Sequence, residues 1–338
     1  MLDSCIIPEV GDAPSEIILS FVVIGYNEAA LLDKCLQSIR VAELSGLVYE
    51  LIYVDGGSED QSREVAQVAG VDQSLGGEKR RRASENRNVG FAAACGRFIQ
   101  FVDGDMTLYP DWPKTALGFL HDHPEIAAVC GNLIEANANP WFKALQIDWA
   151  PREGPIRHCG GAALYRREVL EKLGGFPEDL PYGEEPVFCW RIRNELGMKI
   201  YQLNRPMANH DLAFRGFGDY WRRNVRCGLT YAAVASRCFH STDRLWLRET
   251  ISNLIWGVVL VLSVIALFLD SWLVSAGVIL ALLALLGRKH IQFRARGYSN
   301  GVAALYAVHT YFAKIPIAAG IGLWLIRGVR GASSGAPK

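Results

Sequence analysis

The sequence has no excess of charge of either sign, because 35 lysines and arginines balance 35 aspartates and glutamates among its 338 residues. A neutral chain gives no electrostatic indication of a nucleic-acid partner. The chain also lacks any Cys-x-x-Cys pair, although it contains eight cysteines. This scattering argues against a zinc site or a disulfide framework and indicates reduced, mostly buried thiols in a domain that faces the cytosol.

Residues 1–16 are polar and acidic and lack the apolar run of a signal peptide, so we expect the globular part of the chain to stay in the cytosol. Half of all residues are hydrophobic, and the surplus is concentrated near the C-terminus. Residues 251–269 and 271–287 contain no charged side chain, and each run is long enough to cross a bilayer. The sequence thus predicts a soluble domain followed by a membrane segment.

Three apolar runs have the length of buried strands, and polar residues follow each of them: residues 17–24, 49–54 and 97–102. Helical spacing of apolar residues follows the first run, and Ser58 is a candidate cap for a helix that runs to Ala69 after the second. Strand, loop and helix in this repeated order predict parallel strands joined by right-handed crossovers. The loops should then open at one edge of the sheet, where α/β folds bind ligands.

The third run leads into Asp103-Gly104-Asp105, so two carboxylates emerge together at that edge. A carboxylate there can hold a divalent ion that bridges phosphate oxygens. By itself so short a motif is more often a surface turn. Four consecutive basic residues, 79–82, form either a solvated loop or a contact for a diphosphate or an anionic lipid.

An ordered set of short motifs runs through the first two thirds of the chain. They are Tyr26-Asn27-Glu28, Val54-Asp55-Gly56-Gly57-Ser58, Arg87-Asn88, Asp103-Gly104-Asp105, Gly160-Gly161, Arg166-Arg167, Gly174-Gly175-Phe176, Gly183-Glu184-Glu185, Arg191 and Gly197. In order and approximate spacing, this set resembles a family 2 glycosyltransferase with the GT-A fold, over roughly residues 17–230. The resemblance implies an α/β fold: a Rossmann-like mixed sheet flanked by helices, here followed by interfacial and transmembrane helices.

The resemblance also implies a site for a nucleotide-sugar donor. Its expected residues are Tyr26, Asn27, Glu28, Asp55, Arg87, Asn88 and Asp103. In the family, Asn27 and Glu28 would lie at the nucleoside pocket, and Asp55 would accept a hydrogen bond from the base. Gly56 stands where the family more often has an acid or asparagine, which leaves the base preference open. Structural alternatives remain, because Asn27 can simply turn the chain, Asp55 can cap a turn and Arg87 can pair with a helix acid.

A divalent metal, Mn²⁺ or Mg²⁺, is the expected cofactor. By the resemblance its ligands are Asp103, Asp105 and His210. A lone histidine is more often structural, but a neutral imidazole ligand suits manganese better than magnesium.

The acceptor half of the resemblance contains Gly160 and Gly161, whose small size lets a sugar or a lipid phosphate approach the backbone. We expect Glu184 and Glu185 in the first turn of a helix, where the dipole favours charged carboxylates. The family usually has Glu-Asp here, with the second acid as catalytic base, so Glu185 is the first candidate and Glu184 the second. The alternative is that both only cap the helix.

Residues 214–237 alternate aromatic and basic side chains, which suits an amphipathic helix at a membrane interface. Within it Arg223 and Arg226 are candidates for binding acceptor or donor phosphates. The third apolar stretch, residues 302–326, either crosses the membrane or forms a re-entrant pair split near Lys314. The expected parts are a tail (1–16), a catalytic domain (17–213), interface helices (214–250), a transmembrane hairpin (251–287) and a basic loop with the third apolar segment (288–338).

Together these features predict an inverting, metal-dependent glycosyltransferase anchored in the inner (plasma) membrane, with its catalytic domain in the cytoplasm. The donor would be a nucleotide sugar, with UDP-sugars favoured, and the acceptor a saccharide on a polyprenyl diphosphate, as in polysaccharide or glycan biosynthesis. The alternatives are a polyprenyl-phosphate monosaccharide synthase and a membrane-tethered nucleotide-binding protein without turnover. No Gln-x-x-Arg-Trp motif is present, which makes the chain resemble processive synthases less.

Overall fold

The computed structural model describes residues 17–44, 46–135, 139–149, 151–210, 216–268 and 272–333. The predicted N-terminal tail, 1–16, and the connection between the two predicted membrane runs, 269–271, lie outside these ranges. The chain divides into two compact units. The sheet unit is formed by residues 1–136 and 150–211, and the helical unit by residues 137–149 and 212–338.

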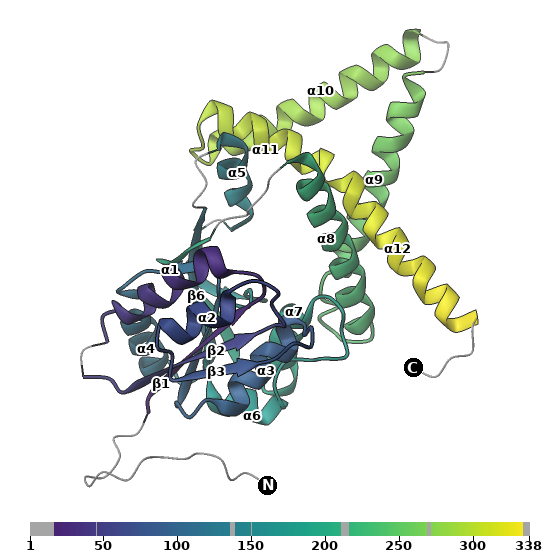
Figure 1. Cartoon of the computed structure of the whole chain (residues 1–338). Helices are drawn as coiled ribbons and strands as arrows, with labels where there is room; N and C mark the ends of the chain where they lie inside the picture. The colour runs from purple at the N-terminus through teal and green to yellow at the C-terminus, as the bar shows by residue number, and fades with distance from the viewer. Residues whose placement is uncertain are drawn as a thin grey trace, which may run out of the picture. The chain divides into compact units, whose positions relative to one another are not determined.

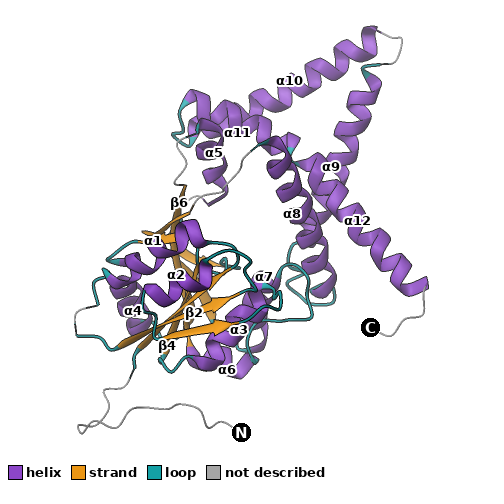
Figure 2. Ribbon diagram, in the orientation of Figure 1, coloured by secondary structure: helices purple, strands orange, loops and turns teal. Residues whose placement is uncertain are grey.

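The sheet unit contains a single mixed sheet of nine strands (Figure 2). The strands are β1 (Leu19–Gly25), β2 (Tyr49–Asp55), β3 (Gln73–Gly76), β4 (Phe98–Asp103), β5 (Met106–Leu108), β6 (Ile126–Glu135), β7 (Gly154–Ile156), β8 (Leu164–Arg166) and β9 (Lys199–His210). Their order across the sheet is β3-β2-β1-β4-β8-β6-β9-β5, with β7 paired to β9.

The first strands confirm the predicted parallel arrangement. Strand β1 pairs in parallel with both β2 and β4, and the register places Gly25 beside Asp55 and Ile24 beside Asp103. The polar loops that follow these strands therefore meet at one edge of the sheet, as the strand-loop-helix repeat predicted.

Six helices pack around this sheet (Figure 1). They are α1 (Ala29–Arg40), α2 (Ser62–Val68), α3 (Ala83–Ala93), α4 (Trp112–Asp122), α6 (Arg167–Leu173) and α7 (Glu184–Glu195). Strands β1, β2 and β4 are buried almost throughout, which matches their uninterrupted apolar sequence. None of the seven cysteines among the described residues forms a disulfide, and five of them are buried.

The structure corrects one local prediction. Ser58 does not cap α2, which begins at Ser62, because its hydroxyl instead accepts a hydrogen bond from the Asn27 amide. Strand β8 is only three residues long. Strand β9 extends to His210 because its second half pairs with β5.

The helical unit contains a short helix, α5 (Pro140–Leu145), with a following 3₁₀ turn, η1 (Gln146–Trp149). Its longer helices are α8 (Phe217–Arg237), α9 (Leu247–Ala266), α10 (Trp272–Ala295), α11 (Asn300–Phe312) and α12 (Lys314–Ser333). Three segments of the described chain are long and apolar enough to span a membrane: 247–266, 272–295 and 300–327. The third comprises α11 and most of α12, and the two helices meet at Ala313, beside the predicted split at Lys314.

Close helix packing in this unit depends on glycine. A side chain at Gly228 of α8 would overlap the Ile317 carbonyl of α12, and one at Gly320 would overlap the Val225 carbonyl. The backbones of α8 and α12 can therefore cross in direct contact.

Candidate functional site

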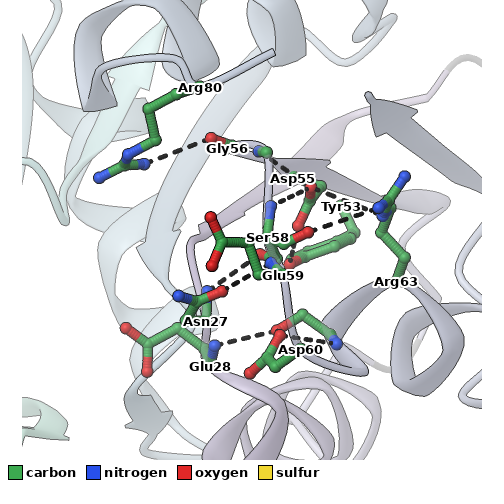
Figure 3. A network of polar contacts seen from close by, with 12 residues as sticks. Asn27, Glu28, Tyr53, Asp55, Gly56, Ser58, Glu59, Asp60, Arg63 and Arg80 are labelled. Carbon is green, nitrogen blue, oxygen red and sulfur yellow. Dashed lines mark hydrogen bonds and ion pairs between the residues drawn. The ribbon is translucent and has the colours of Figure 1, made fainter. Parts of the chain in front are cut away.

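Two loops at the carboxyl ends of β1 and β2 are joined by hydrogen bonds (Figure 3). The Asn27 amide donates to the Ser58 hydroxyl over 2.9 Å, and the Glu59 amide donates to Asn27 Oδ1 over 2.8 Å. The Glu28 amide donates to the Ser62 hydroxyl over 2.9 Å. Asn27 adopts a left-handed backbone conformation, with φ of 57°, which asparagine tolerates better than most residues. These contacts fix the loop that presents Tyr26 and Glu28.

Asp55 is fully buried at the end of β2. Its Oδ2 accepts hydrogen bonds from the amides of Gly57 (2.9 Å) and Ser58 (2.8 Å), and the Tyr53 hydroxyl donates to Oδ1 over 3.2 Å (Figure 3). The carboxylate thus shapes the loop after β2, in agreement with the structural alternative for this residue. The expected hydrogen bond to a nucleobase stays a prediction.

One residue of the basic run 79–82 lies directly on this loop pair. The Arg80 guanidinium carbon is 3.3 Å from the centroid of the Tyr26 ring, and Arg80 Nη1 donates to the Gly56 carbonyl over 3.3 Å. A guanidinium stacked on an aromatic ring is held in place while its charge stays available. The sequence alone left this run as either a solvated loop or a contact for a diphosphate or an anionic lipid.

The carboxylates of Glu28, Asp103 and Asp105 lie near one another at the end of β4. Burial and the nearby charges of Asp105, Asp103 and Asp60 raise the pKa of Glu28 to about 7. His210, which β9 places opposite Met106 of β5, has its Nε2 3.5 Å from Asp105 Oδ2. Negative charge at this density favours a bound cation, and carboxylate oxygens with one imidazole are suitable donors for Mn²⁺.

The described residues contain no group of three or more histidine, cysteine, aspartate or glutamate side chains arranged to hold a metal ion by themselves. The pair of Asp105 and His210 nevertheless has the donor chemistry that a divalent metal needs. The residues therefore fit a metal that takes its remaining ligands from water or from the phosphates of a bound nucleotide.

Arg87 on α3 connects the donor and acceptor motifs. Its side chain is only 3% exposed, and its guanidinium nitrogens lie 3.2 Å from Asp103 Oδ1, 3.5 Å from Glu184 Oε1 and 3.1 Å from Glu185 Oε1. Gly161 lies against the same guanidinium, and a side chain at that position would overlap Arg87 Nη2. Glycine at 161 therefore makes room for Arg87, while Gly160 has open space beside it.

Glu184 and Glu185 begin α7, as predicted, with Gly183 at the N-cap position. Burial, together with the charges of Glu184 and Asp103, raises the pKa of Glu185 to about 7 against the opposing effect of Arg87. One arginine cannot neutralise three carboxylates, so the Glu185 carboxyl gains and loses its proton near neutral pH. A pKa in this range suits a general base.

Three other predicted site residues have positions or partners outside this set of contacts. Asn88 holds the loop after α6, because its Nδ2 donates to the Phe176 carbonyl (2.9 Å) and to Glu178 Oε1 (2.7 Å) while its Oδ1 accepts from the Phe176 amide. Arg223 and Arg226 lie on α8 of the helical unit, and both are exposed. Their roles, like those of the other site residues, stay predictions.

Sequence reasoning missed the contacts of Ser58, Ser62 and Arg80 and the joint pairing of Arg87 with both motif halves. Ser58 belongs to one of the family motifs, but its motif does not predict that its hydroxyl accepts a hydrogen bond from the Asn27 amide. Arg87 and Glu184 are 97 residues apart in sequence, and no local pattern reveals such a contact.

Residues 20–174 match the family model described as "Glycosyl transferase family 2", and together with the GT-A architecture this match shows that the chain carries a domain of that family. The chain is similar to glycosyltransferase AglE of Haloferax volcanii, at 23% identity over 71% of this chain and 80% of the relative. It is 30% identical to the pre-mycofactocin glycosyltransferase of Mycobacterium tuberculosis, over 37% of this chain and only 29% of that protein.

Among solved structures, the mannosyltransferase PcManGT of Pyrobaculum calidifontis, determined with GDP-Man and Mn²⁺, is similar with a TM-score of 0.64. The identity is 18%, and the match covers 93% of this chain and 89% of that one. At this identity the similarity establishes the shared fold and leaves the substrates open. Residues 20–174 therefore carry a domain of the family 2 glycosyltransferase type.

Proposed function

We propose that the protein is a membrane-anchored, inverting glycosyltransferase that moves a sugar from a nucleotide donor to a lipid-linked acceptor, a saccharide on a polyprenyl diphosphate. The observation that carries this proposal is the arrangement around Arg87. A single buried guanidinium contacts Asp103, at the sheet edge that bears the donor motifs, and Glu185, at the N-terminus of α7. A base and a nucleotide-sugar site joined in this way suit one in-line displacement.

In the proposed mechanism Glu185 takes the proton of the acceptor hydroxyl while that oxygen attacks the anomeric carbon, and the nucleoside diphosphate leaves from the opposite face. Arg87 holds the Glu185 carboxylate in position and stabilises it when it is ionised. Arg80, stacked on Tyr26, offers positive charge to the leaving diphosphate. A divalent ion held by Asp105 and His210, with Asp103 beside them, would neutralise charge that develops on the leaving oxygens.

The anchoring is supported by the three segments of the helical unit that are long and apolar enough to span a membrane. Basic residues flank the apolar stretch 251–287 of the α9–α10 pair on both sides: Arg237, Arg244 and Arg248 before it, and Arg288, Lys289, Arg294 and Arg296 after it. By the positive-inside rule both flanks, and with them the catalytic domain, belong to the cytoplasmic face of the inner membrane.

The test is sugar transfer by the full chain in detergent, measured over a panel of UDP- and GDP-sugars with manganese or magnesium and polyprenyl-linked acceptors. We expect transfer from one donor, with UDP-sugars favoured. The rate of transfer should fall 10²- to 10⁴-fold in Glu185→Gln. Transfer should require the metal, and Asp105→Asn should raise the metal concentration that half-maximal activity needs. Glu171→Gln, at an exposed position of α6, is the matched control and should behave like the parent. Donor binding without turnover in every protein would instead support a tethered nucleotide-binding protein.

A further inference from the structure

The helical unit contains a polar cavity of about 440 Å³ among helices whose outer surfaces are largely apolar. It is lined by residues of α5, η1, α8, α9, α11 and α12. All of the described lining residues belong to the helical unit, and none of them is a member of the carboxylate cluster in the sheet unit. Polar space inside candidate membrane helices is costly and usually serves a ligand.

Lys314 is the first cation in this cavity. It begins α12 in the middle of the 300–327 apolar segment, and its ammonium donates a hydrogen bond to Asn253 Oδ1 over 2.8 Å. Within the described part of the chain, no carboxylate oxygen lies within 4 Å of the Lys314 ammonium. A partly buried ammonium whose partner is neutral has lost part of its hydration without a compensating charge, so a bound anion would stabilise it.

Among the described lining residues, Arg223 of α8 is the second cation and Asp148 of η1 is the one acid. Asp148 accepts a hydrogen bond from the Tyr306 hydroxyl, and its Oδ2 lies 3.6 Å from His309 Nε2. The contacts of this carboxylate that the structure describes are thus with Tyr306 and His309 of α11. In the part of the lining that the structure describes, the two cations Lys314 and Arg223 outnumber the one acid, so the cavity favours an anionic ligand.

An apolar groove of about 530 Å³ adjoins the cavity. Its walls include Trp141, Phe142, Phe217 and Phe312, and Tyr220 lines both the groove and the cavity. The Tyr220 ring stacks on Phe312 with centroids 6.2 Å apart, while its hydroxyl is 2.8 Å from His309 Nδ1. Tyr220 therefore presents an aromatic side to the groove and a polar tip to the cavity wall.

From this pairing we infer that the cavity and the groove together bind the lipid of the acceptor, a single-chain polyprenyl phosphate or diphosphate. The phosphate lies between Lys314 and Arg223, and the first isoprene units lie against Phe217, Tyr220 and Phe312. One groove beside one cationic cavity suits a single-chain amphiphile better than a phospholipid with two acyl chains. This inference rests on the proposed function, because it names the site that holds the lipid of that acceptor.

The experiment measures binding of geranyl phosphate to the full chain in neutral detergent by isothermal titration calorimetry. Geraniol, inorganic phosphate and phosphatidylglycerol serve as separate probes of the chain, the head and a two-chain anionic lipid. We expect geranyl phosphate to bind at least tenfold more tightly than each of the three. Lys314→Gln should weaken that binding about tenfold or more, and Lys314→Arg should restore most of it.

Arg327→Gln is the matched control, because it removes one exposed positive charge from the same helix. Equal losses in Arg327→Gln and Lys314→Gln would overturn the site in favour of general attraction to basic surface. Equal affinity for phosphatidylglycerol would make this a phospholipid site and overturn the assignment to acceptor lipid. Phe217→Ser gives a second variant that tests the groove without cutting into the core, since Phe217 is 64% exposed. It should weaken binding of geranyl phosphate more than binding of inorganic phosphate, and an unchanged ratio of the two affinities would remove the groove from the proposal.

Sugar transfer separates failure of this inference from failure of the proposed function. Parent protein that binds geranyl phosphate in the cavity but transfers no sugar to any lipid would refute the proposed function while the lipid site stands. Transfer whose KM for the lipid acceptor is the same in the parent and in Lys314→Gln would refute the lipid site while the function stands.

Discussion

The raised pKa of Glu185 gives a quantitative expectation for the pH dependence of transfer. A surface glutamate is ionised well below neutrality, but burial and the charges of Glu184 and Asp103 raise the pKa of Glu185 to about 7. The plot of kcat/KM against pH reports the ligand-free enzyme. We therefore expect an acid limb with a midpoint near pH 7, so that at pH 6 about one tenth of the base is ionised and about one tenth of the plateau rate remains.

Single substitutions around Glu185 should move this limb in opposite directions. Glu184→Gln removes a charge that disfavours ionisation of Glu185, so the limb should move to lower pH while turnover is retained. Arg87→Gln removes the charge that favours ionisation, so the limb should move to higher pH. The assay is initial-rate transfer between pH 5 and 9 at saturating metal, with circular dichroism of each variant as the folding control.

Two results would refute this reasoning. An acid limb near pH 4.5 in the parent would mean that Glu185 titrates as an exposed glutamate or is not the base. Loss of turnover in Glu184→Gln, with turnover retained in Glu185→Gln, would assign the base to Glu184.

Three further predictions concern charge, metal and packing. Arg87→Met leaves three carboxylates without their buried partner, so it should lower the free energy of unfolding by about 3–5 kcal/mol. Urea denaturation should show this as a lower midpoint, and an unchanged midpoint would contradict the ionic cluster. Asp105→Asn and His210→Ala should each weaken Mn²⁺ binding in the presence of nucleotide, measured by electron paramagnetic resonance titration, whereas equal binding in parent and variants would place the metal elsewhere. Gly228→Leu should separate α8 from α12 and lower the Tm of the chain in detergent, while leucine at the uncrowded Gly277 of α10 should leave it unchanged.

Much of the donor edge could be predicted from local sequence. Uninterrupted apolar runs of strand length, each followed by polar residues, were sufficient to place β1, β2 and β4 in parallel and to bring Asp55 and Asp103 to one edge. The short strands β3, β5 and β7 were not predicted, because three or four residues carry too little periodicity. The extension of β9 to His210 depends on pairing with β5, which lies about 100 residues away in sequence.

The sequence by itself determined the family 2 motifs, the acidic start of α7 and the apolar character of the C-terminal helices, because each is set by neighbouring residues and their spacing. Only the tertiary structure decided that Arg87 is shared among Asp103, Glu184 and Glu185, that Gly161 exists to admit it, and that Lys314 and Arg223 line one cavity. These contacts join segments of the chain that are far apart in sequence. Their energies depend on burial and on the sum of nearby charges, which no local pattern encodes.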